Sequence, residues 1–238
     1  MTALQATATH PGRALYSILR YWRSSGLQGL NLPVVEIEEE VEQAKADVKA
    51  ELLKLNNECS NCSKCGLSAT RKRVISGHGG NQARILFVGS QPLEEDEGKD
   101  PQGAEVAELM NRMISRLGLE AEDVYHTLAT RCKTPADRPP EPTEMNHCRS
   151  WLEKEIDLIQ PSAIVTLGTI STQHLLQLTS PISKLRGKWH THKSIPVMPT
   201  YHPLYLLKKP AAKKNVWSDM QAILKILPPP AQEKPCPS

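Results

Sequence analysis

Four short apolar segments recur between residues 84 and 203, and a helical pattern follows each of them. The segments are RILFVG, DVYHTLAT, AIVTLG and IPVMPTYHP. The helical patterns occupy residues 104–118, 143–160, 169–178 and 213–227, and Thr143 is expected to cap the second of these helices. Strands that alternate with helices in this way predict a mainly parallel sheet with helices on both of its faces.

The segments outside this alternation predict a helical extension and a tail. Residues 13–26 and residues 32–55 have helical patterns, and the second pattern is acidic. The Pro-rich end of the chain is expected to be disordered. We therefore expect a helical extension over residues 1–58, a main α/β domain over residues 59–227 and a tail over residues 228–238.

The charge of the chain is small in total but unevenly distributed. The 238 residues carry a formal net charge of +3, and residues 181–220 contain eight basic residues and one acidic residue. A segment of this kind is typical of proteins that bind a polyanion, and a set of solvated lysines is the simpler alternative. The sequence has no signal-peptide pattern and no apolar run of membrane-spanning length, so we expect a soluble, cytoplasmic monomer without membrane contact.

The cysteines are the clearest candidates for metal ligands. Cys59, Cys62 and Cys65 lie in the run CSNCSKCG, and Cys132 and Cys148 follow with fifteen residues between them. Such a set can form a four-cysteine site for zinc or for an iron–sulfur cluster. Zinc ribbons usually contain two tight pairs, whereas only one pair here is tight, which favours iron–sulfur over zinc. Scattered structural thiols are the remaining alternative, and the spacing leaves open which of the three close cysteines is the spare.

The run GSQPLEED at residues 89–96 follows the first apolar segment directly. A turn at the carboxyl end of a strand lies where open α/β sheets bind ligands. The backbone N–H groups from Gly89 to Gln91 can donate hydrogen bonds there, and Ser90 and Gln91 supply polar side chains. This turn is therefore a candidate substrate site.

Taken together, these motifs resemble one known family. Their order is C-x2-C-x-L, a strand ending in G-x-x-P, VYxT…C, a further cysteine, LG, LRGKWH and PTYHPLYLL. This order resembles the family 4 uracil-DNA glycosylases, which are the iron–sulfur members of the uracil-DNA glycosylase superfamily. The resemblance covers about residues 59–227, so we expect a glycosylase-like domain there, and it leaves residues 1–58 unexplained.

The resemblance implies a fold and a cofactor. The fold is a three-layer α/β/α sandwich with a four-stranded, mainly parallel sheet, to which this chain adds its N-terminal helical extension. The cofactor is a [4Fe-4S] cluster. Gly-Leu follows one of the ligands in the family pattern, as it follows Cys65 here, which makes Cys59 the spare. The implied ligands are Cys62, Cys65, Cys132 and Cys148.

The resemblance also assigns a substrate pocket, and this chain departs from the family there. The family motif G-E-A-P-G corresponds to the stretch that starts at Gly89, so Ser90 replaces its Glu. The uracil-stacking Phe of the family corresponds to Pro101, and its uracil-reading Asn corresponds to Leu128. Leu128 has neither a donor nor an acceptor, so we expect weaker selection for uracil than in the family.

Two residues are implied to carry the chemistry. The His of the family's H-P motif is retained as His202, which would stabilise negative charge on the leaving base. Elsewhere in the superfamily the third residue of the first motif positions the attacking water, and that residue is Gln91 here. An amide can orient a water molecule but is a poor base. The alternative for His202 is that it simply caps a turn before Pro203.

The basic segment corresponds to the DNA-contacting region of the family. The residues expected to meet DNA are Lys184, Arg186, Lys188, Lys208, Lys209, Lys213 and Lys214. A solvated helix start is the alternative for the last four of them. The helical extension is expected to pack on the domain or to bind a protein partner.

We therefore expect a DNA glycosylase, a hydrolase of base excision repair that removes uracil or another deaminated base from DNA. The first alternative is a catalytically silent DNA-binding iron–sulfur protein on the same scaffold. The second is a redox or structural iron–sulfur module without a role on DNA.

Overall fold

A computed structural model of the protein describes residues 34–93 and 104–227. The chain divides into two units, residues 1–51 and 52–238, and each is described by itself. In the first unit the described residues form the beginning of a long helix, in which Gln43 Nε2 donates a hydrogen bond to Asp47 Oδ1 at 2.9 Å. The second unit contains the sheet.

The elements alternate as the sequence predicts. In chain order they are α2 (Val34–Ser60), β1 (His78–Gly79), β2 (Ile85–Gly89), α3 (Ala104–Arg116), β3 (Val124–Leu128), α4 (Pro142–Ile159), β4 (Ala163–Leu167), α5 (Thr169–Leu176), α6 (Ile182–Leu185), β5 (His190–His192), β6 (Ile195–Thr200), α7 (Pro203–Lys208) and α8 (Lys213–Leu224). Short 3-10 turns connect several of them, and one of these, η4 (Pro135–Asp137), lies between β3 and α4.

The sheet has six strands in the order β1-β3-β2-β4-β6-β5. The four inner strands are parallel to one another, which confirms the predicted four-stranded parallel core. The two outer strands pair antiparallel with β3 and β6. They are only two and three residues long, and the sequence analysis did not foresee them.

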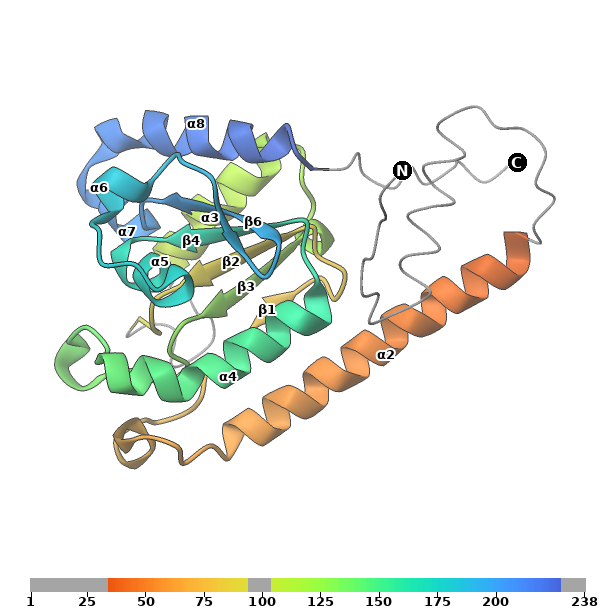
Figure 1. Cartoon of the computed structure of the whole chain (residues 1–238), viewed down its shortest axis with the longest axis horizontal. Coiled ribbons are helices and arrows are strands. Elements are labelled where there is room, and N and C mark those ends of the chain that lie inside the picture. Colours follow the sequence, from red (N-terminus) through yellow and green to blue (C-terminus); the bar gives the residue numbers. More distant parts are fainter. Residues whose placement is uncertain (1–33, 94–103, 228–238) are drawn as a thin grey trace, which may run out of the picture. The chain divides into compact units, whose positions relative to one another are not determined.

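Helices cover both faces of the sheet, as the predicted sandwich requires. Figure 1 shows α3, α7 and α8 on one face and α4 on the other. Alternate strand residues, such as Phe87 and Val165, pack with α3, α7 and α8 in the main apolar core. All five residues of β2 are buried, because the strand lies at the centre of the sheet with both faces covered.

The ends of two helices show how local chemistry sets their boundaries. Gly118 lies just beyond α3 with a φ of +68°, a left-handed conformation that Gly adopts at little cost. The predicted cap of α4 at Thr143 is wrong. The N-cap is Glu141, which forms a capping box with Glu144, because Pro142 occupies the first turn, where its missing N–H costs nothing.

Several predictions fall outside the described residues. The helix at residues 13–26 and the tail at 228–238 belong to this group, as does Pro101. In the described part of the chain, none of the helices is both long enough and apolar enough to cross a membrane.

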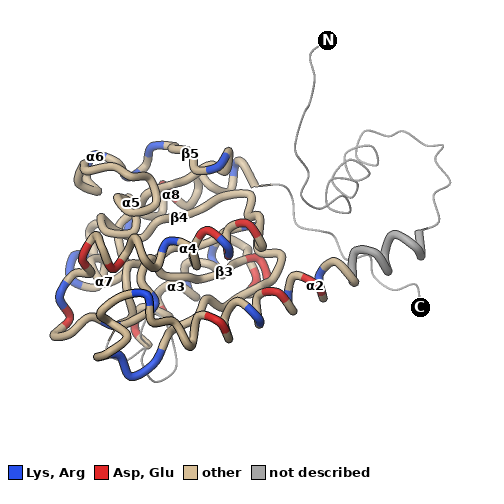
Figure 2. The backbone as a smooth tube through the Cα atoms, turned by 60° about the horizontal axis from the view of Figure 1, so that its bottom comes forward, with Lys and Arg blue, Asp and Glu red and all other residues tan. Residues whose placement is uncertain are grey.

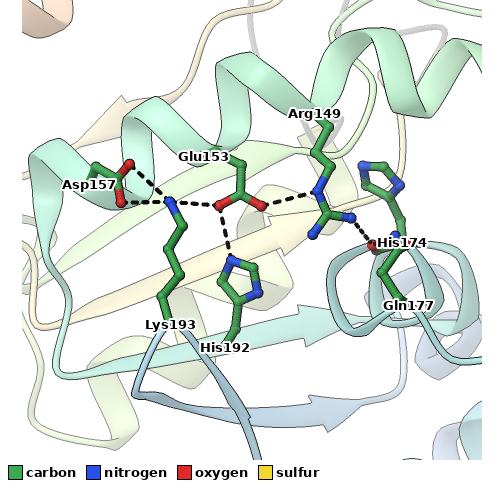
Figure 3. A network of polar contacts seen from close by, with 7 residues as sticks. All are labelled: Arg149, Glu153, Asp157, His174, Gln177, His192 and Lys193. Atoms are coloured by element: carbon green, nitrogen blue, oxygen red, sulfur yellow. Dashed lines mark hydrogen bonds and ion pairs between the residues drawn. The ribbon is translucent and has the colours of Figure 1, made fainter.

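A polar network ties α4 to the β5–β6 hairpin (Figure 3). Lys193 in the hairpin turn contacts Asp157 Oδ1 at 2.8 Å and Glu153 Oε2 at 2.9 Å, and His192 Nε2 lies 3.0 Å from the same Glu153 oxygen. Lys193 and Ser194 both have a positive φ, as a two-residue hairpin turn of type I′ requires. The ion pairs from α4 therefore hold a turn that lacks the usual Gly or Asn.

Candidate active site

The carboxyl ends of β2 and β4 mark the place where this sheet is built to bind a ligand. The chain leaves β2 through α3 to reach β3 on one side, and it returns through α4 to β4 on the other side of β2. Figure 1 shows these two helices on opposite faces of the sheet. Such a reversal of strand order is the topological switch point at which open α/β sheets bind ligands.

The predicted substrate turn lies at this point and is fixed by the neighbouring strand. Gly89 ends β2 and pairs with Leu128 of β3. The Gly89 carbonyl accepts a hydrogen bond from Ala129 N at 2.9 Å, and the Ser90 carbonyl accepts bonds from Thr130 N at 2.9 Å and Thr130 Oγ1 at 3.0 Å. The backbone of the turn therefore continues the sheet for two residues beyond the strand.

His202 lies two strands from this turn, directly after β6. Its Nδ1 accepts a hydrogen bond from Leu204 N at 3.1 Å and so caps α7. Burial lowers the pKa of His202 to about 4, so the ring is neutral at neutral pH. A neutral imidazole whose Nδ1 accepts carries its single proton on Nε2. His202 therefore caps the helix and still has one N–H donor left for a ligand.

Gly168 lets β4 end in close contact with His202. A Cβ atom at Gly168 would lie 3.2 Å from His202 Cβ, and the φ of +87° suits only Gly. Gly168 N also donates to the Thr200 carbonyl at 2.8 Å, which joins the ends of β4 and β6. His202 can therefore lie against the carboxyl end of β4 because residue 168 has no side chain.

Gln91 is held by a residue that the sequence analysis did not identify. Thr134 Oγ1 lies 3.1 Å from Gln91 Oε1 and 2.5 Å from the Arg138 carbonyl oxygen. Thr134 is buried in the segment that follows β3, and Gln91 is half-buried. The Gln91 side chain, which follows β2, is therefore held by Thr134 from the segment that follows β3.

The remaining predicted pocket positions are apolar or small. Leu128 is buried with 3% of its surface exposed, at the last residue of β3. Ser90 is half-buried, and its carbonyl oxygen accepts a hydrogen bond from Thr130 Oγ1. Gln91 is therefore the one amide side chain among these positions in the described part of the turn.

The predicted cluster ligands lie close enough to interact electrostatically. Burial raises the pKa of the Cys132 thiol to about 12, and the charges of Cys148 and Cys65 add to this rise. Burial also raises the pKa of Cys148, and Cys65 and Cys62 contribute in the same direction. Among the described residues, no three His, Cys, Asp or Glu side chains could hold a single metal ion.

Cys59 belongs to the same region. It lies in the last turn of α2 and packs with Leu55 and Trp151, and Cys62 lies against this group. Burial raises the pKa of Cys59 to about 11, an effect that Arg131 opposes and Cys148 reinforces. All five described cysteines are free thiols.

Positively charged donors accompany the thiols. Arg71 Nη1 donates to Cys132 Sγ at 3.7 Å. Arg131 is fully buried and forms an ion pair with Glu155, and its Nε and Nη1 have no hydrogen-bond acceptor among the described residues. Glu155 in turn accepts hydrogen bonds from Tyr125 at 3.0 Å and Thr127 at 2.5 Å. A buried cation with unused N–H donors and a second arginine that donates to a thiol suit an anionic, sulfur-rich group.

Comparison with known proteins decides the family. Residues 76–221 match the model of the uracil DNA glycosylase superfamily. The chain belongs to this superfamily. Its described sheet and flanking helices agree with that assignment.

Curated relatives of the chain carry the name type-4 uracil-DNA glycosylase. The protein from Sulfurisphaera tokodaii is 38% identical over 183 residues, which cover 72% of this chain and 83% of the relative. The protein from Archaeoglobus fulgidus is 32% identical over 175 residues, which cover 70% of this chain and 88% of the relative. The protein from Thermotoga maritima is 33% identical over 166 residues, covering 67% and 85%. These matches confirm the predicted resemblance to type-4 uracil-DNA glycosylases.

The basic residues predicted to meet DNA are mostly exposed in this uracil-DNA glycosylase fold. The exposed ones are Lys184, Lys188, Lys208, Lys209, Lys213 and Lys214. In Figure 2 blue segments mark basic residues along the α6–β5 stretch and beside α7. Arg186 differs, because its guanidinium bonds with the Asp219 carboxylate and with the Asn215 carbonyl at 2.9 Å.

Aromatic contacts bring the two basic stretches together. The Arg186 guanidinium lies 5.5 Å from the Tyr201 ring centre, and the Tyr201 and Tyr205 rings are 4.9 Å apart. Tyr205 and Trp189 are themselves exposed large side chains. Arg186, just after α6, is therefore linked through Tyr201 to Tyr205 of α7.

Sequence reasoning missed three supporting residues of the site. Thr134 contacts Gln91 across 43 positions, and nothing in its local sequence marks it. Gly168 could have been noticed, because a Gly at the carboxyl end of a predicted strand often permits a close backbone approach. Nothing in the local sequence indicated that Arg131 is buried, since a basic residue beside a cysteine is usually exposed.

Proposed function

We propose that the protein is a DNA glycosylase that hydrolyses the N-glycosidic bond of uracil or of another deaminated base in DNA. The observation that carries this proposal is the neutral His202, which lies beside Gly168 at the carboxyl end of β4 and keeps an Nε2–H donor that its bond to Leu204 does not use. The type-4 names of the relatives support the same activity.

The reaction requires stabilisation of charge on the departing base. As the bond from C1′ to the base nitrogen breaks, its electron pair leaves with the base, and the sugar becomes oxocarbenium-like. A fixed donor aimed at the base oxygen stabilises this anion, which is the role we assign to His202 Nε2–H. A neutral donor suits the task, because it does not transfer its proton outright to the base.

Water completes the reaction. Its oxygen forms a bond to C1′, and the proton that it loses is finally taken up by the departed base. We assign the orientation of this water to Gln91, which lies at the carboxyl end of β2. The electrophile is reactive enough that orientation by an amide can replace a carboxylate base.

The choice of base is expected to be broad. Leu128 is buried and apolar where the family has an amide, so it cannot pair with the edge of uracil. A pocket without such paired hydrogen bonds discriminates weakly among bases of similar shape. We therefore propose that deaminated bases other than uracil are also substrates. Gly89 and Ser90 are assigned to this pocket with Leu128, and Pro101 lies outside the described residues.

We assign DNA binding to the surface formed by the α6–β5 stretch, α7 and the start of α8. Its six exposed lysines can neutralise phosphates, and exposed Tyr205 and Trp189 lie among them. Arg186 is assigned a supporting part, since Asp219 already binds its guanidinium.

The thiol cluster fits a [4Fe-4S] group held by Cys62, Cys65, Cys132 and Cys148. Each cysteine would bind a different iron, so the thiols need not converge on one ion. The unused N–H groups of Arg131 and the Arg71 donor would meet the sulfur atoms. When bound, the cluster supplies iron–sulfur bonds that tie residues 62–65 to the segment after β3. Thr134, two residues beyond Cys132, would then be held firmly next to Gln91.

A base-release assay tests the proposed function. Duplexes that each contain one uracil, hypoxanthine or xanthine are incubated with the wild-type protein, and the free base is measured by chromatography. The proposal expects release of at least one base. Release of none of them, with DNA binding retained, would favour the catalytically silent alternative.

A further inference from the structure

Thr134 Oγ1 contacts two oxygen atoms but carries only one proton. Thr134 Oγ1 has two oxygen neighbours, Gln91 Oε1 at 3.1 Å and the Arg138 carbonyl at 2.5 Å. A hydroxyl group has a single proton, so it can donate to one of these oxygens and not to both. The other contact has to be satisfied in a different way.

The Arg138 carbonyl is the oxygen that receives the Thr134 proton. A carbonyl oxygen can only accept, and two oxygens 2.5 Å apart repel each other unless a proton lies between them. Thr134 is the donor that the described residues offer to this carbonyl. Thr134 is also buried, so water has little access to replace the bond.

The Arg138 carbonyl is itself held in place. The Arg138 guanidinium donates to both oxygens of Glu144, at 2.9 Å and 2.6 Å, and Glu144 caps the start of α4. Arg138 N also donates to the Pro135 carbonyl at 3.3 Å, which closes the turn η4. The proton of Thr134 is therefore directed to an acceptor that α4 fixes.

We infer that the Gln91 amide presents its NH2 group to Thr134 and its oxygen to the substrate side. A half-turn of the amide exchanges Oε1 and Nε2 with almost no change in shape, and the hydrogen-bond partners decide between the two arrangements. With the Thr134 proton committed to Arg138, the Thr134 oxygen has lone pairs that can accept a hydrogen bond, and the NH2 group of Gln91 is the donor that the described residues place there. Oε1 then faces away from Thr134 as an acceptor.

This orientation determines how Gln91 acts on water, and this consequence rests on the proposed function. An acceptor oxygen receives one O–H of the attacking water, which turns a lone pair of the water oxygen away from Gln91 and towards C1′. An NH2 group in the same place would donate to that lone pair and weaken the nucleophile. Thr134 is therefore a positioning residue that makes Gln91 an acceptor for the attacking water.

The first experiment tests the orientation without any measurement of activity. In Gln91→Glu the NH2 group is lost, and an ionised carboxylate would face the Thr134 lone pairs, so the pKa of the new carboxyl group should rise. The unfolded state then ionises at a lower pH than the folded state, and the stability of the variant falls relative to wild type as pH rises from about 4.5 to 7. Denaturant unfolding at several pH values measures this trend, and Gln91→Met serves as the uncharged control.

The opposite trend would overturn the inference. If Thr134 donates to Gln91, a carboxylate at position 91 gains a charge-assisted hydrogen bond. Gln91→Glu would then be at least as stable as Gln91→Met at pH 7 and would lose stability in acid.

The second experiment tests the effect on catalysis. Thr134→Val keeps the shape of the side chain and removes the hydroxyl group, so it should slow single-turnover base release by about 10-fold to 10²-fold with unchanged DNA affinity. Thr134→Ser should restore most of the rate. In a Gln91→Ala background, Thr134→Val should have no further effect, because the two residues act as one unit.

The outcomes separate the two proposals. Additive effects of Thr134→Val and Gln91→Ala would show that Thr134 does not act through Gln91, and the inference would fail while the glycosylase activity stands. If the wild type releases no base, the proposed function fails, and the stability trend of Gln91→Glu still decides the orientation.

Discussion

His202 Nδ1 accepts the backbone N–H of Leu204 at 3.1 Å, and this one bond fixes both the cap of α7 and the tautomer of the ring. The two roles that the sequence allowed for His202, capping and catalysis, are therefore compatible. The bond uses Nδ1 and leaves Nε2–H for the leaving base.

Variants of His202 can separate its two roles. His202→Ala should lower the rate of base release by about 10²–10³-fold, because it removes a donor to the departing anion. It also removes the cap of α7, which costs about 0.5–2 kcal/mol of stability. His202→Asn keeps a cap, since an Asn oxygen can accept the same N–H, but it has no group at the Nε2 position. If His202→Asn loses as much rate as His202→Ala but keeps normal stability, the lost rate is due to Nε2. A rate of His202→Asn close to wild type would contradict the role of Nε2–H as the donor to the leaving base.

The pH dependence of base release follows from the low pKa of His202. The ring is neutral above a pH of about 4, so the rate should not fall as the pH is raised through 6.5, the ordinary value for His. Single-turnover rates between pH 5 and pH 8 check this expectation. A fall in rate centred near pH 6.5 would indicate that the protonated ring is the active form.

Acid should destabilise the folded domain before its carboxylates titrate. Burial lowers the pKa of His126 to about 3 and the pKa values of His174 and His202 to about 4. Below a pH of 6.5 the unfolded chain binds protons at these positions and the folded chain does not, so stability falls as pH drops from 6.5 towards 4. His126→Phe, which keeps the stacking on Phe87, should flatten this slope in denaturant titrations. An unchanged slope would show that His126 is not buried in its neutral form.

The cysteine variants test the assigned cluster ligands. Cys62→Ala, Cys65→Ala, Cys132→Ala and Cys148→Ala should each abolish the iron content and the brown colour and destabilise the fold, because cluster binding is coupled to folding. Cys59→Ala is one matched control, and Cys236→Ala, which changes the sixth cysteine in the Pro-rich tail, is the other. Both should retain iron. Bleaching by Cys59→Ala would show that the spare thiol was wrongly chosen, and zinc without iron after anaerobic purification would refute the cluster.

The lysine cluster can be tested by salt titration. Replacement of Lys208, Lys209, Lys213 and Lys214 by Ala should weaken DNA binding about equally for all sequences and reduce the slope of log affinity against log salt by up to about 3–4. Lys193→Ala is the control, because Asp157 and Glu153 already bind that ammonium group. An unchanged salt slope in the fourfold variant would mean that these lysines only solvate the surface.

The sequence predicted the inner strands well because each is a short apolar run that is buried on both faces. The edge strands β1 and β5 could not be predicted in this way, since His78-Gly79 and His190-Thr191-His192 are short and polar. The start of α4 was misplaced because Thr143 is a good cap residue, but Pro142 and the capping box of Glu141 set the start earlier.

The candidate site divides along similar lines. Gln91 and His202 follow predicted strands, so their place at one edge of the sheet could be inferred from the alternation of strands and helices. The contacts that set the orientation of the Gln91 amide and the tautomer of His202 come from other segments, which the sequence pattern does not place. Thr134 meets Gln91 only after β3 pairs with β2, and the His202 tautomer depends on the geometry of α7.

The central claim is that this scaffold cuts the N-glycosidic bond with His202 Nε2–H as the donor. The most direct measurement is single-turnover release of free base from the uracil, hypoxanthine and xanthine duplexes by the wild type and by His202→Asn, at matched DNA occupancy. The account predicts release of at least one base by the wild type and a rate about 10²–10³-fold lower for His202→Asn. Release at equal rates by the two proteins, or by neither of them, would contradict it.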